Sequence, residues 1–318
     1  MTKEPAVRRE IKNADFIVET STLGCAADDR RFYDRLARQL HRMTAHPRYG
    51  RAWVPWTSFH EMAATPDPRR RDVLGVVLNL YRELRDRFLL TGTFQETIKA
   101  EWSDPPHNVS RSFSAFESDL VACSRTNGRG TFIDELGEDF RAWRIDRRLE
   151  YEEHNEDLTR AFMEREELPR SIALVLERPW TTEAYDVSDD IAGQVIERFA
   201  ERDREEGVQK AKANPEAYRT TWTHAFLYRL AQFAQTIPTE QRAKGRFGRY
   251  AKLMKGHRND FIDAELVSLG SRCGFLITQD GDLRERLDYL FNRGIVRIQA
   301  FDFDFIEGAW TEPVVRED

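Results

Sequence analysis

Two segments near opposite ends of the chain, residues 15–61 and residues 260–283, constrain the fold most. Each joins short apolar runs to acidic residues that stand where a strand ends or a helix begins. An open α/β sheet gathers its polar chemistry at these positions. Two like charges about 4 Å apart repel by roughly 4 kcal/mol at an effective dielectric of about 20. If the two segments meet, their carboxylates therefore require protons or a divalent cation nearby.

The first segment alternates strand and helix patterns. Residues 15–18 are an apolar run typical of a strand, and apolar positions at helical spacing predict a helix over residues 28–43. Residues 52–55 form a second predicted strand. The next helix has Ser58 as its expected cap and Glu61 three positions later, as in a capping box. That cap is the structural alternative to a catalytic role for Glu61.

The same alternation returns after Pro238. An apolar helix face over residues 264–273, a strand over 275–277, a helix over 283–290 and a strand over 295–301 follow one another. Strands that alternate with helices in this way predict a parallel sheet.

The region between the two segments is helical in pattern. Three apolar stripes at helical spacing lie within residues 73–84, 191–199 and 226–234. We therefore predict an α/β fold, a parallel sheet flanked by helices, with a large and mostly α-helical insertion. The expected organisation is residues 1–66 as the first part of the core, 67–240 as the insertion and 241–318 as the second part of the core.

Composition bears on the binding partners and the cellular compartment of the protein. The chain has 318 residues and a net charge of -6, so its overall charge does not indicate a nucleic-acid partner. Cys25, Cys123 and Cys273 are too few for a disulfide framework or a structural zinc site, and they read as ordinary buried or half-buried thiols. The amino terminus lacks the apolar run of a secretion signal, and no stretch is apolar enough to span a membrane. These features predict a cytoplasmic protein.

Three stretches resemble the sequence elements of PIN-domain nucleases. Phe16-Ile-Val-Glu-Thr-Ser-Thr-Leu23 resembles their opening strand and acidic turn, and Pro55 to Glu61 resembles the element that carries a Glu on the helix after a strand. Residues 263–280 resemble a helix that begins with Asp, followed by a strand that ends in Thr-x-Asp. The order and spacing are those of the family, and the similarity covers residues 14–64 and 245–310.

The resemblance implies a divalent-metal-dependent nuclease, an endoribonuclease acting on RNA rather than DNA. One or two Mg2+ or Mn2+ ions would activate a water for in-line attack on a phosphodiester. The carboxylates carried over as catalytic metal ligands are Glu19, Glu61, Asp263 and Asp280. Ser21 and Thr278 would orient a carboxylate or a coordinated water. Alternatively, both hydroxyls only satisfy backbone groups of their turns.

Asp260 and Asp282 are alternates for the third and fourth carboxylates. Asp260 lies three residues before Asp263, so both can face one side of a helix start. Asp282 can instead be the N-cap of the helix that begins near Leu283.

Glu19 departs from the family pattern, which has Asp at this position. Its carboxylate reaches one carbon–carbon bond further, roughly 1.5 Å. Because Mg2+ demands near-ideal octahedral geometry, this change can weaken metal binding, shift it towards Mn2+ or abolish it. The alternative function is therefore a catalytically silent PIN-like scaffold that binds nucleic acid or a partner protein. A third interpretation treats the carboxylates as unrelated helix caps.

The strongest local charge signal is the segment 242–258, which has seven Lys or Arg residues and no acid. Such side chains neutralise phosphates, and Phe247 or Tyr250 can stack on an unpaired base, so the segment is expected to guide a nucleic-acid strand to the metal site. A solvated cationic helix face is the alternative. The expected nucleic-acid contacts are Lys244, Arg246, Arg249, Lys252, Lys255 and Arg258. The helical insertion is a further candidate surface for self-association or a protein partner.

Neighbouring polar and aromatic groups are weaker candidates. His60 adjoins Glu61 on the same predicted helix, so the two side chains are expected to point in different directions. Trp53 and Trp56 are expected to be core aromatics rather than platforms for base stacking.

Overall fold

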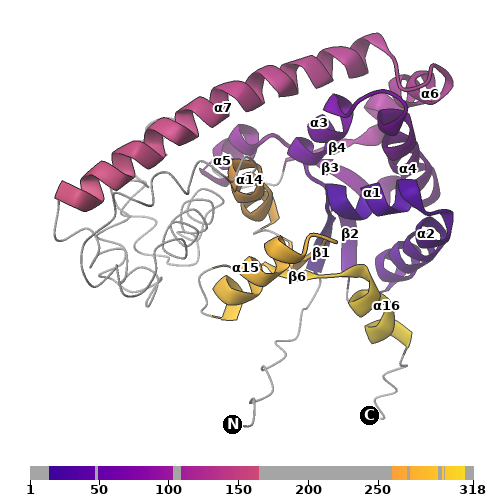
Figure 1. The fold of residues 1–318 in the computed structure, drawn as a ribbon. Helices are drawn as coiled ribbons and strands as arrows, with labels where there is room; N and C mark the ends of the chain where they lie inside the picture. The colour runs from indigo at the N-terminus through magenta and orange to yellow at the C-terminus, as the bar shows by residue number, and fades with distance from the viewer. Residues whose placement is uncertain are drawn as a thin grey trace, which may run out of the picture.

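The computed structural model describes residues 14–46, 49–102, 109–164, 260–270, 273–292, 296 and 298–311. These residues form a six-stranded sheet with helices packed around it (Figure 1). In chain order the elements, of which η1 and η2 are 3-10 helices, are β1 (Ala14–Val18), α1 (Thr20–Asp28), α2 (Arg30–Ala45), β2 (Tyr49–Val54), α3 (Trp56–Ala64), α4 (Arg69–Leu84), η1 (Arg85–Arg87), β3 (Phe88–Thr91), α5 (Phe94–Trp102), β4 (Ser110–Ser112), η2 (Phe113–Phe116), α6 (Glu117–Arg125), α7 (Thr131–Glu164), α14 (Asp260–Gly270), β5 (Phe275–Ile277), α15 (Gly281–Asn292), β6 (Gln299–Phe301) and α16 (Phe303–Thr311).

The strand order is β4-β3-β2-β1-β5-β6, with β1 in the interior of the sheet. All neighbouring strands are parallel except β3 and β4, which are antiparallel. Phe16 of β1 pairs with Ala52 on one side and with Phe275 on the other. The two ends of the sequence therefore meet by direct strand pairing, as predicted. The order reverses between β1 and β5, and such a switch point is where open α/β sheets bind ligands.

Alternate strand residues face opposite sides of the sheet, because the side-chain period of a strand is two. The side chains on one face pack into a hydrophobic core together with buried residues of α1, α2, α3, α4, α6 and α16. The strand residues on that face are Phe16, Val18, Ala52, Val54, Phe88, Leu90, Phe275 and Ile277. Burying a large apolar side chain of this kind stabilises the fold by roughly 1.5–3 kcal/mol. Figure 1 shows α2 and α4 on one side of the sheet and α15 on the other.

Two strands, β3 and β4, lie where the sequence predicts a helical insertion. The sheet is therefore mixed rather than purely parallel, and two of its strands lie beyond the predicted end of the first core segment at residue 66. All four residues of β3 are buried, and a short continuous apolar run has no alternation to distinguish a strand from a buried helix. The described helices of this region, α4 to α7, agree with the helical pattern. Residues 165–259, which include residues 165–240 of the predicted insertion, lie outside the described residues.

Helix starts follow local capping chemistry, with one difference from prediction. Asp29 caps α2 by accepting from the backbone N–H of Arg31 at 2.8 Å. The predicted cap at Ser58 is wrong, because α3 starts three residues earlier than that cap implies and Pro55 occupies the cap position. Proline suits a helix start, since the first backbone N–H groups need no partner within the helix. Ser58 and Glu61 thus lie inside α3, and no capping box accounts for Glu61.

The cysteines and the long aromatic side chains agree with the sequence analysis. Cys123 is a buried thiol, and Cys25 and Cys273 are half-buried thiols. Trp53 and Trp56 are buried, with 5% and 9% of their surface exposed, so both are core aromatics.

Candidate active site

Glu19 is the first residue after β1 and the N-cap of α1. Its backbone N–H donates to the carbonyl of Ile277 at 3.1 Å, which continues the β1–β5 pairing by one residue. Its carboxylate oxygen Oε2 accepts from the backbone N–H of Ser21 at 2.9 Å and from the Ser21 hydroxyl. The hydroxyl of Thr278 donates to the same oxygen at 3.0 Å. The carboxylate of Glu19 is thus tied to the start of its own helix and to the end of β5.

Ser21 and Thr278 also lock the two turns together. Their hydroxyl oxygens are 3.1 Å apart, and the backbone N–H of Gln279 donates to Ser21 Oγ at 2.9 Å. The backbone N–H of Asp280 donates to Thr278 Oγ1 at 3.0 Å. Both hydroxyls therefore contact the Glu19 carboxylate and satisfy turn backbone, so the two interpretations drawn from the sequence hold together.

Glu61 approaches this group from α3. Burial is the largest cause that raises the pKa of Glu61, while the nearby Thr20 hydroxyl and the Arg144 guanidinium act to lower it. Thr20 is close enough to influence the carboxyl, but its hydroxyl does not reach the geometry of a full hydrogen bond. Burial also raises the pKa of Glu19, its hydrogen bonds from Ser21 and Thr278 oppose that shift, and the charge of Glu61 adds to it. Glu61 thus lies near enough for its charge to act on the carboxyl of Glu19.

The two turns that follow β1 and β5 contain two buried polar atoms with no hydrogen-bond partner among the described residues, Thr20 Oγ1 and Gln279 Nε2, and the first of these lies near Glu61. A buried polar group without a partner costs about 1–3 kcal/mol, so such groups usually have a water, ion or ligand as partner. Carboxylate and hydroxyl oxygens are hard donors of the kind that Mg2+ and Mn2+ prefer. The donor chemistry of Glu19, Glu61 and Thr20 therefore fits a divalent cation.

Asp280 is exposed and joins this group through its backbone, whose N–H donates to Thr278 Oγ1, while its side chain has a structural role. Its Oδ1 accepts from the backbone N–H of Leu283 at 3.0 Å, so Asp280 is the N-cap of α15. Asp282 is exposed in the first turn of that helix and is not its cap, which corrects the alternative considered for Asp282.

The third predicted carboxylate, Asp263, lies on α14 and is partly buried. Its Oδ2 is 3.6 Å from a guanidinium nitrogen of Arg286 on α15. Two residues later, Glu265 accepts from the hydroxyl of Thr57 on α3 at 3.1 Å. Thr57 is one helical turn before Glu61, so Glu265 contacts the helix that carries the candidate site, and the sequence analysis missed this carboxylate. Asp260 begins α14, and its side chain is not among the described ones.

The predicted carboxylates are thus brought together only in part. Glu19, Glu61, Ser21 and Thr278 form one group with Asp280 at its margin, whereas Asp263 contacts Arg286. Among the side chains that the structure describes, no three His, Cys, Asp or Glu residues are already arranged around a common metal position. The predicted nucleic-acid contacts between residues 242 and 258 lie outside the described part of the chain.

His60 points away from the carboxylates, as predicted. Its ring lies 4.7 Å from that of Trp56 and 6.2 Å from that of Phe140 on α7. Burial lowers the pKa of His60 to about 4, so its imidazole is neutral at physiological pH. His60 belongs to the packing of α3 against α7 rather than to the candidate site.

A separate cleft of about 610 Å³ lies on α2 and α4. Several of its polar groups contact one another: the Tyr33 hydroxyl donates to Glu83 at 2.8 Å, and Arg30 pairs with Asp34 at 3.0 Å. None of the carboxylates predicted from the sequence lines this cleft. The group around Glu19 is therefore the better candidate for chemistry.

Comparisons with protein-family models, with curated proteins and with solved structures find no match to this chain. In the part of the chain that the structure describes, no helix combines the length and apolar character that crossing a membrane requires.

Proposed function

We propose that this protein is a divalent-metal-dependent nuclease with a PIN-like core, an endoribonuclease that hydrolyses phosphodiester bonds in RNA. One observation carries the proposal. The carboxylate of Glu19, at the carboxyl end of β1, accepts hydrogen bonds from Ser21 and from Thr278 at the end of the neighbouring strand β5, where an α/β sheet binds ligands, and the charge of Glu61 on α3 acts on it. The preference for RNA rests on the sequence resemblance to PIN-domain nucleases.

A bound divalent cation would offset the cost of placing two carboxyls in this buried position. Burial disfavours the ionised form of both carboxyls and raises both pKa values, and the charge of Glu61 adds to the rise in the pKa of Glu19. In the proposal these two residues hold Mg2+ or Mn2+, with Asp280 and Asp263 as further ligands. A bound ion of this kind lowers the pKa of a coordinated water and offsets the negative charge that gathers on a phosphodiester.

Hydrogen bonds from Ser21 and Thr278 hold the carboxylate of Glu19 in place and so would offset the extra length of its side chain. Ser21 and Thr278 hold Oε2, whereas no described residue donates to Oε1. Because these hydrogen bonds hold the carboxylate over the start of α1, the extra methylene of Glu19 would not move the carboxylate further into the site. Glu19 would therefore offer one oxygen, Oε1, as a ligand, and its hydrogen-bonded partners would fix the direction of that oxygen.

Two contacts favour the alternative, a silent PIN-like scaffold that binds nucleic acid or a partner protein. Asp263 lies near the positive charge of Arg286, and Asp280 spends one carboxylate oxygen on capping α15. Either contact would have to loosen before that carboxylate binds metal with both oxygens. A cytoplasmic location and self-association or partner binding through the helical region remain predictions.

The test is incubation of purified wild type and Glu19→Gln with bulk RNA, tRNA and single-stranded DNA in Mn2+. The proposal expects wild type to cleave RNA and Glu19→Gln to lose at least 100-fold in rate, on the order of what a displaced ligand or positioning group costs. Glu135→Gln, which changes an exposed Glu of α7, is the matched control and should cleave like wild type. Equal cleavage by wild type and Glu19→Gln would rule out this site, and binding of RNA without cleavage would favour the scaffold.

A further inference from the structure

The cleft on α2 and α4 carries arginines that the candidate site does not use. Its volume of about 610 Å³ lies in the range of ligand-binding pockets, so it has room for more than one phosphate group. Three of the lining residues are arginines and two are acids, so the cleft is locally basic although the whole chain has a net charge of -6. The full lining is Arg30, Tyr33, Asp34, Ala37, Arg38, His41, Arg42 and Glu83.

The two acids of the cleft have partners around Tyr33, near the start of α2. Asp34 forms an ion pair with Arg30 at 3.0 Å, and Glu83 accepts from the Tyr33 hydroxyl at 2.8 Å. The Arg30 guanidinium also lies 4.8 Å from the centre of the Tyr33 ring. The positive charge of Arg30 is therefore offset within the cleft, whereas the arginines further along α2 are not involved in these contacts.

Arg38 and Arg42 follow on the same helix, one turn apart and both exposed, with the exposed His41 between them in sequence. Arg38 Nε donates to the backbone carbonyl of Asp34 at 3.1 Å, which directs the side chain along α2 and leaves the terminal nitrogens of its guanidinium for a ligand. Among the described residues, neither guanidinium has a carboxylate partner. This end of the cleft therefore presents two positive charges that nothing on the described surface neutralises.

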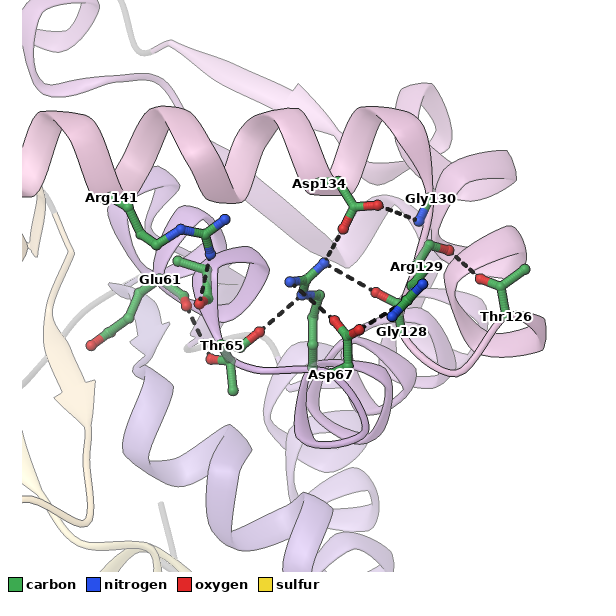
Figure 2. A network of polar contacts seen from close by, with 11 residues as sticks. Glu61, Thr65, Asp67, Thr126, Gly128, Arg129, Gly130, Asp134 and Arg141 are labelled. Atoms are coloured by element: carbon green, nitrogen blue, oxygen red, sulfur yellow. Dashed lines mark hydrogen bonds and ion pairs between the residues drawn. The ribbon is translucent and has the colours of Figure 1, made fainter.

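The helices that form the cleft are anchored in the core. Leu36 of α2 is fully buried, and α4 is held at its start by Arg70, of whose side chain 5% is exposed. The Arg70 guanidinium forms an ion pair with Asp134 of α7. It also donates to the carbonyls of Thr65 at 2.9 Å and of Gly128 at 3.2 Å (Figure 2). Binding groups on helices held in this way are preorganised, which lowers the entropy cost of binding a ligand.

The lining of the cleft suits a nucleic-acid backbone better than a protein partner. Its apolar groups are Ala37 and the ring of Tyr33, both buried, and none of the large hydrophobic side chains exposed on the described residues lies on α2 or α4. Protein partners take most of their binding energy from apolar and aromatic anchors in well-packed pockets. Phosphates need only positive charge and hydrogen-bond donors.

We propose that Arg38 and Arg42 bind phosphates of the RNA strand at a distance from the bond that is cleaved. This inference rests on the proposed function and adds a second contact region for its substrate. Guanidinium groups suit the task, because they stay charged and offer a planar fork of donors to phosphate oxygens. Helices α1 and α2 have 9 and 16 residues, roughly 14 and 24 Å. A stacked strand that follows both from Glu19 is thus on the order of ten nucleotides long.

The test measures binding without turnover, using a fluorescein-labelled single-stranded RNA of about 20 nucleotides in EDTA at about 0.1 M salt. Arg38→Gln/Arg42→Gln should raise Kd roughly tenfold and reduce the slope of log K against log salt by about 1.4, which corresponds to two lost phosphate contacts on a single strand. Arg38→Lys/Arg42→Lys should recover part of the affinity, since it restores the charge without the fork. Both side chains are exposed, so the melting temperature should stay close to that of wild type.

The matched control is Arg31→Gln/Arg125→Gln. It also removes two exposed arginines, one of them on α2, but neither lines the cleft. Because salt screens charges that lie more than about 10 Å from the strand, this control should change Kd by less than about twofold. An equal loss of affinity in the control would show that net charge alone attracts RNA, which would overturn the inference.

Three further results would decide the matter. Absence of RNA binding by wild type, or equal Kd values for wild type and Arg38→Gln/Arg42→Gln, would overturn the inference, even if wild type cleaves RNA in Mn2+. Displacement of the labelled RNA by poly-glutamate as readily as by unlabelled RNA of equal charge would also overturn it and indicate an acidic protein partner. Binding that depends on the two arginines, with a wild type that does not cleave RNA in Mn2+, would contradict the nuclease activity and leave the phosphate contacts standing.

Discussion

The hydroxyl of Thr278 donates a 3.0 Å hydrogen bond to the carboxylate of Glu19 across 259 positions of sequence. The register of β1 against β5 produces this contact, because Val18 pairs with Ile277 and each acidic turn begins at the next residue. Two strands that start their turns at the same level of the sheet place their first polar side chains side by side. The candidate site is thus a direct consequence of strand pairing.

Replacing Thr278 with valine should weaken Mn2+ binding directly, and not only through a loss of folding stability. The change keeps the shape of the side chain but removes the donor to Glu19 Oε2 and the acceptor for the Asp280 N–H. We expect at least tenfold weaker Mn2+ binding by calorimetry, as for other groups that orient metal ligands. Thr22→Val is the matched control, since the Thr22 hydroxyl donates to the Ile277 carbonyl at 3.0 Å and does not touch Glu19. An equal loss of Mn2+ affinity in both variants would show that Thr278 acts only through the fold.

Glu19→Gln should raise the melting temperature of the metal-free protein at about pH 8 but not at about pH 4. Burial raises the pKa of Glu19 above its ordinary value of 4.5, with the charge of Glu61 adding to the shift. A carboxyl with a raised folded pKa contributes stability when protonated, at low pH, and that contribution is lost as pH rises through the folded pKa. Glutamine avoids this loss because it stays neutral.

Thermal melts in EDTA at the two pH values, with Glu135→Gln as control, measure the effect of Glu19→Gln. Adding Mn2+ should then stabilise wild type more than Glu19→Gln, because the ion binds the folded protein. A lower melting temperature for Glu19→Gln at both pH values would contradict the electrostatic account of the pair.

Arg70→Met should destabilise the protein strongly. The guanidinium is buried and serves Asp67, Asp134 and two backbone carbonyls, which would lose their donor together. Breaking a fully buried pair costs about 3–5 kcal/mol, and the partial exposure of both carboxylates reduces the expected loss to about 2–3 kcal/mol in urea unfolding. Arg71→Met is the control, because its pair with Asp72 is 41% exposed on both sides and should contribute less than about 1 kcal/mol. Similar losses in the two variants would contradict a special role for the Arg70 network.

Two glycine-to-alanine changes should have opposite signs. At Gly137 a Cβ would collide with the backbone of Ala63, so Gly137→Ala should separate α7 from α3 and lower stability by about 1–3 kcal/mol. At Gly75, inside α4, a Cβ would meet nothing within 4 Å, so Gly75→Ala should gain about 0.5–1 kcal/mol from helix propensity. Urea unfolding measures both, and a neutral or stabilising Gly137→Ala would show that the helices do not lie as close as described.

The sequence predicts the meeting of the chain ends but not the full sheet. Strands β1 and β5 are recognisable because each is an apolar run followed by an acidic turn, and β2 because the run Ala52-Trp-Val precedes Pro55. Strand β3 escapes notice because all its residues are buried and no alternation marks them. Strand β4 consists of three polar or charged residues at the sheet edge, for which local pattern carries no strand signal.

The side-chain partners of the carboxylates are harder still to predict. The resemblance to PIN-domain nucleases leads us to expect Asp263 and Asp280 as ligands, but only tertiary structure shows that Arg286 lies near Asp263 and that Asp280 caps α15. Glu265 contacts Thr57 of α3 from a helix far away in sequence, so no local motif identifies it. A sequence pattern places a residue on an element, whereas its charge partners depend on how the elements pack.

Calorimetric titration of Mn2+ into wild type, Glu19→Gln and Glu61→Gln tests most directly whether Glu19 and Glu61 share a divalent ion. We predict a specific site in wild type and in the Glu135→Gln control, and its loss in both site variants. Absence of specific Mn2+ binding to wild type, or equal affinity in the wild type and the two site variants, would contradict the proposed metal site and the hydrolytic mechanism built on it.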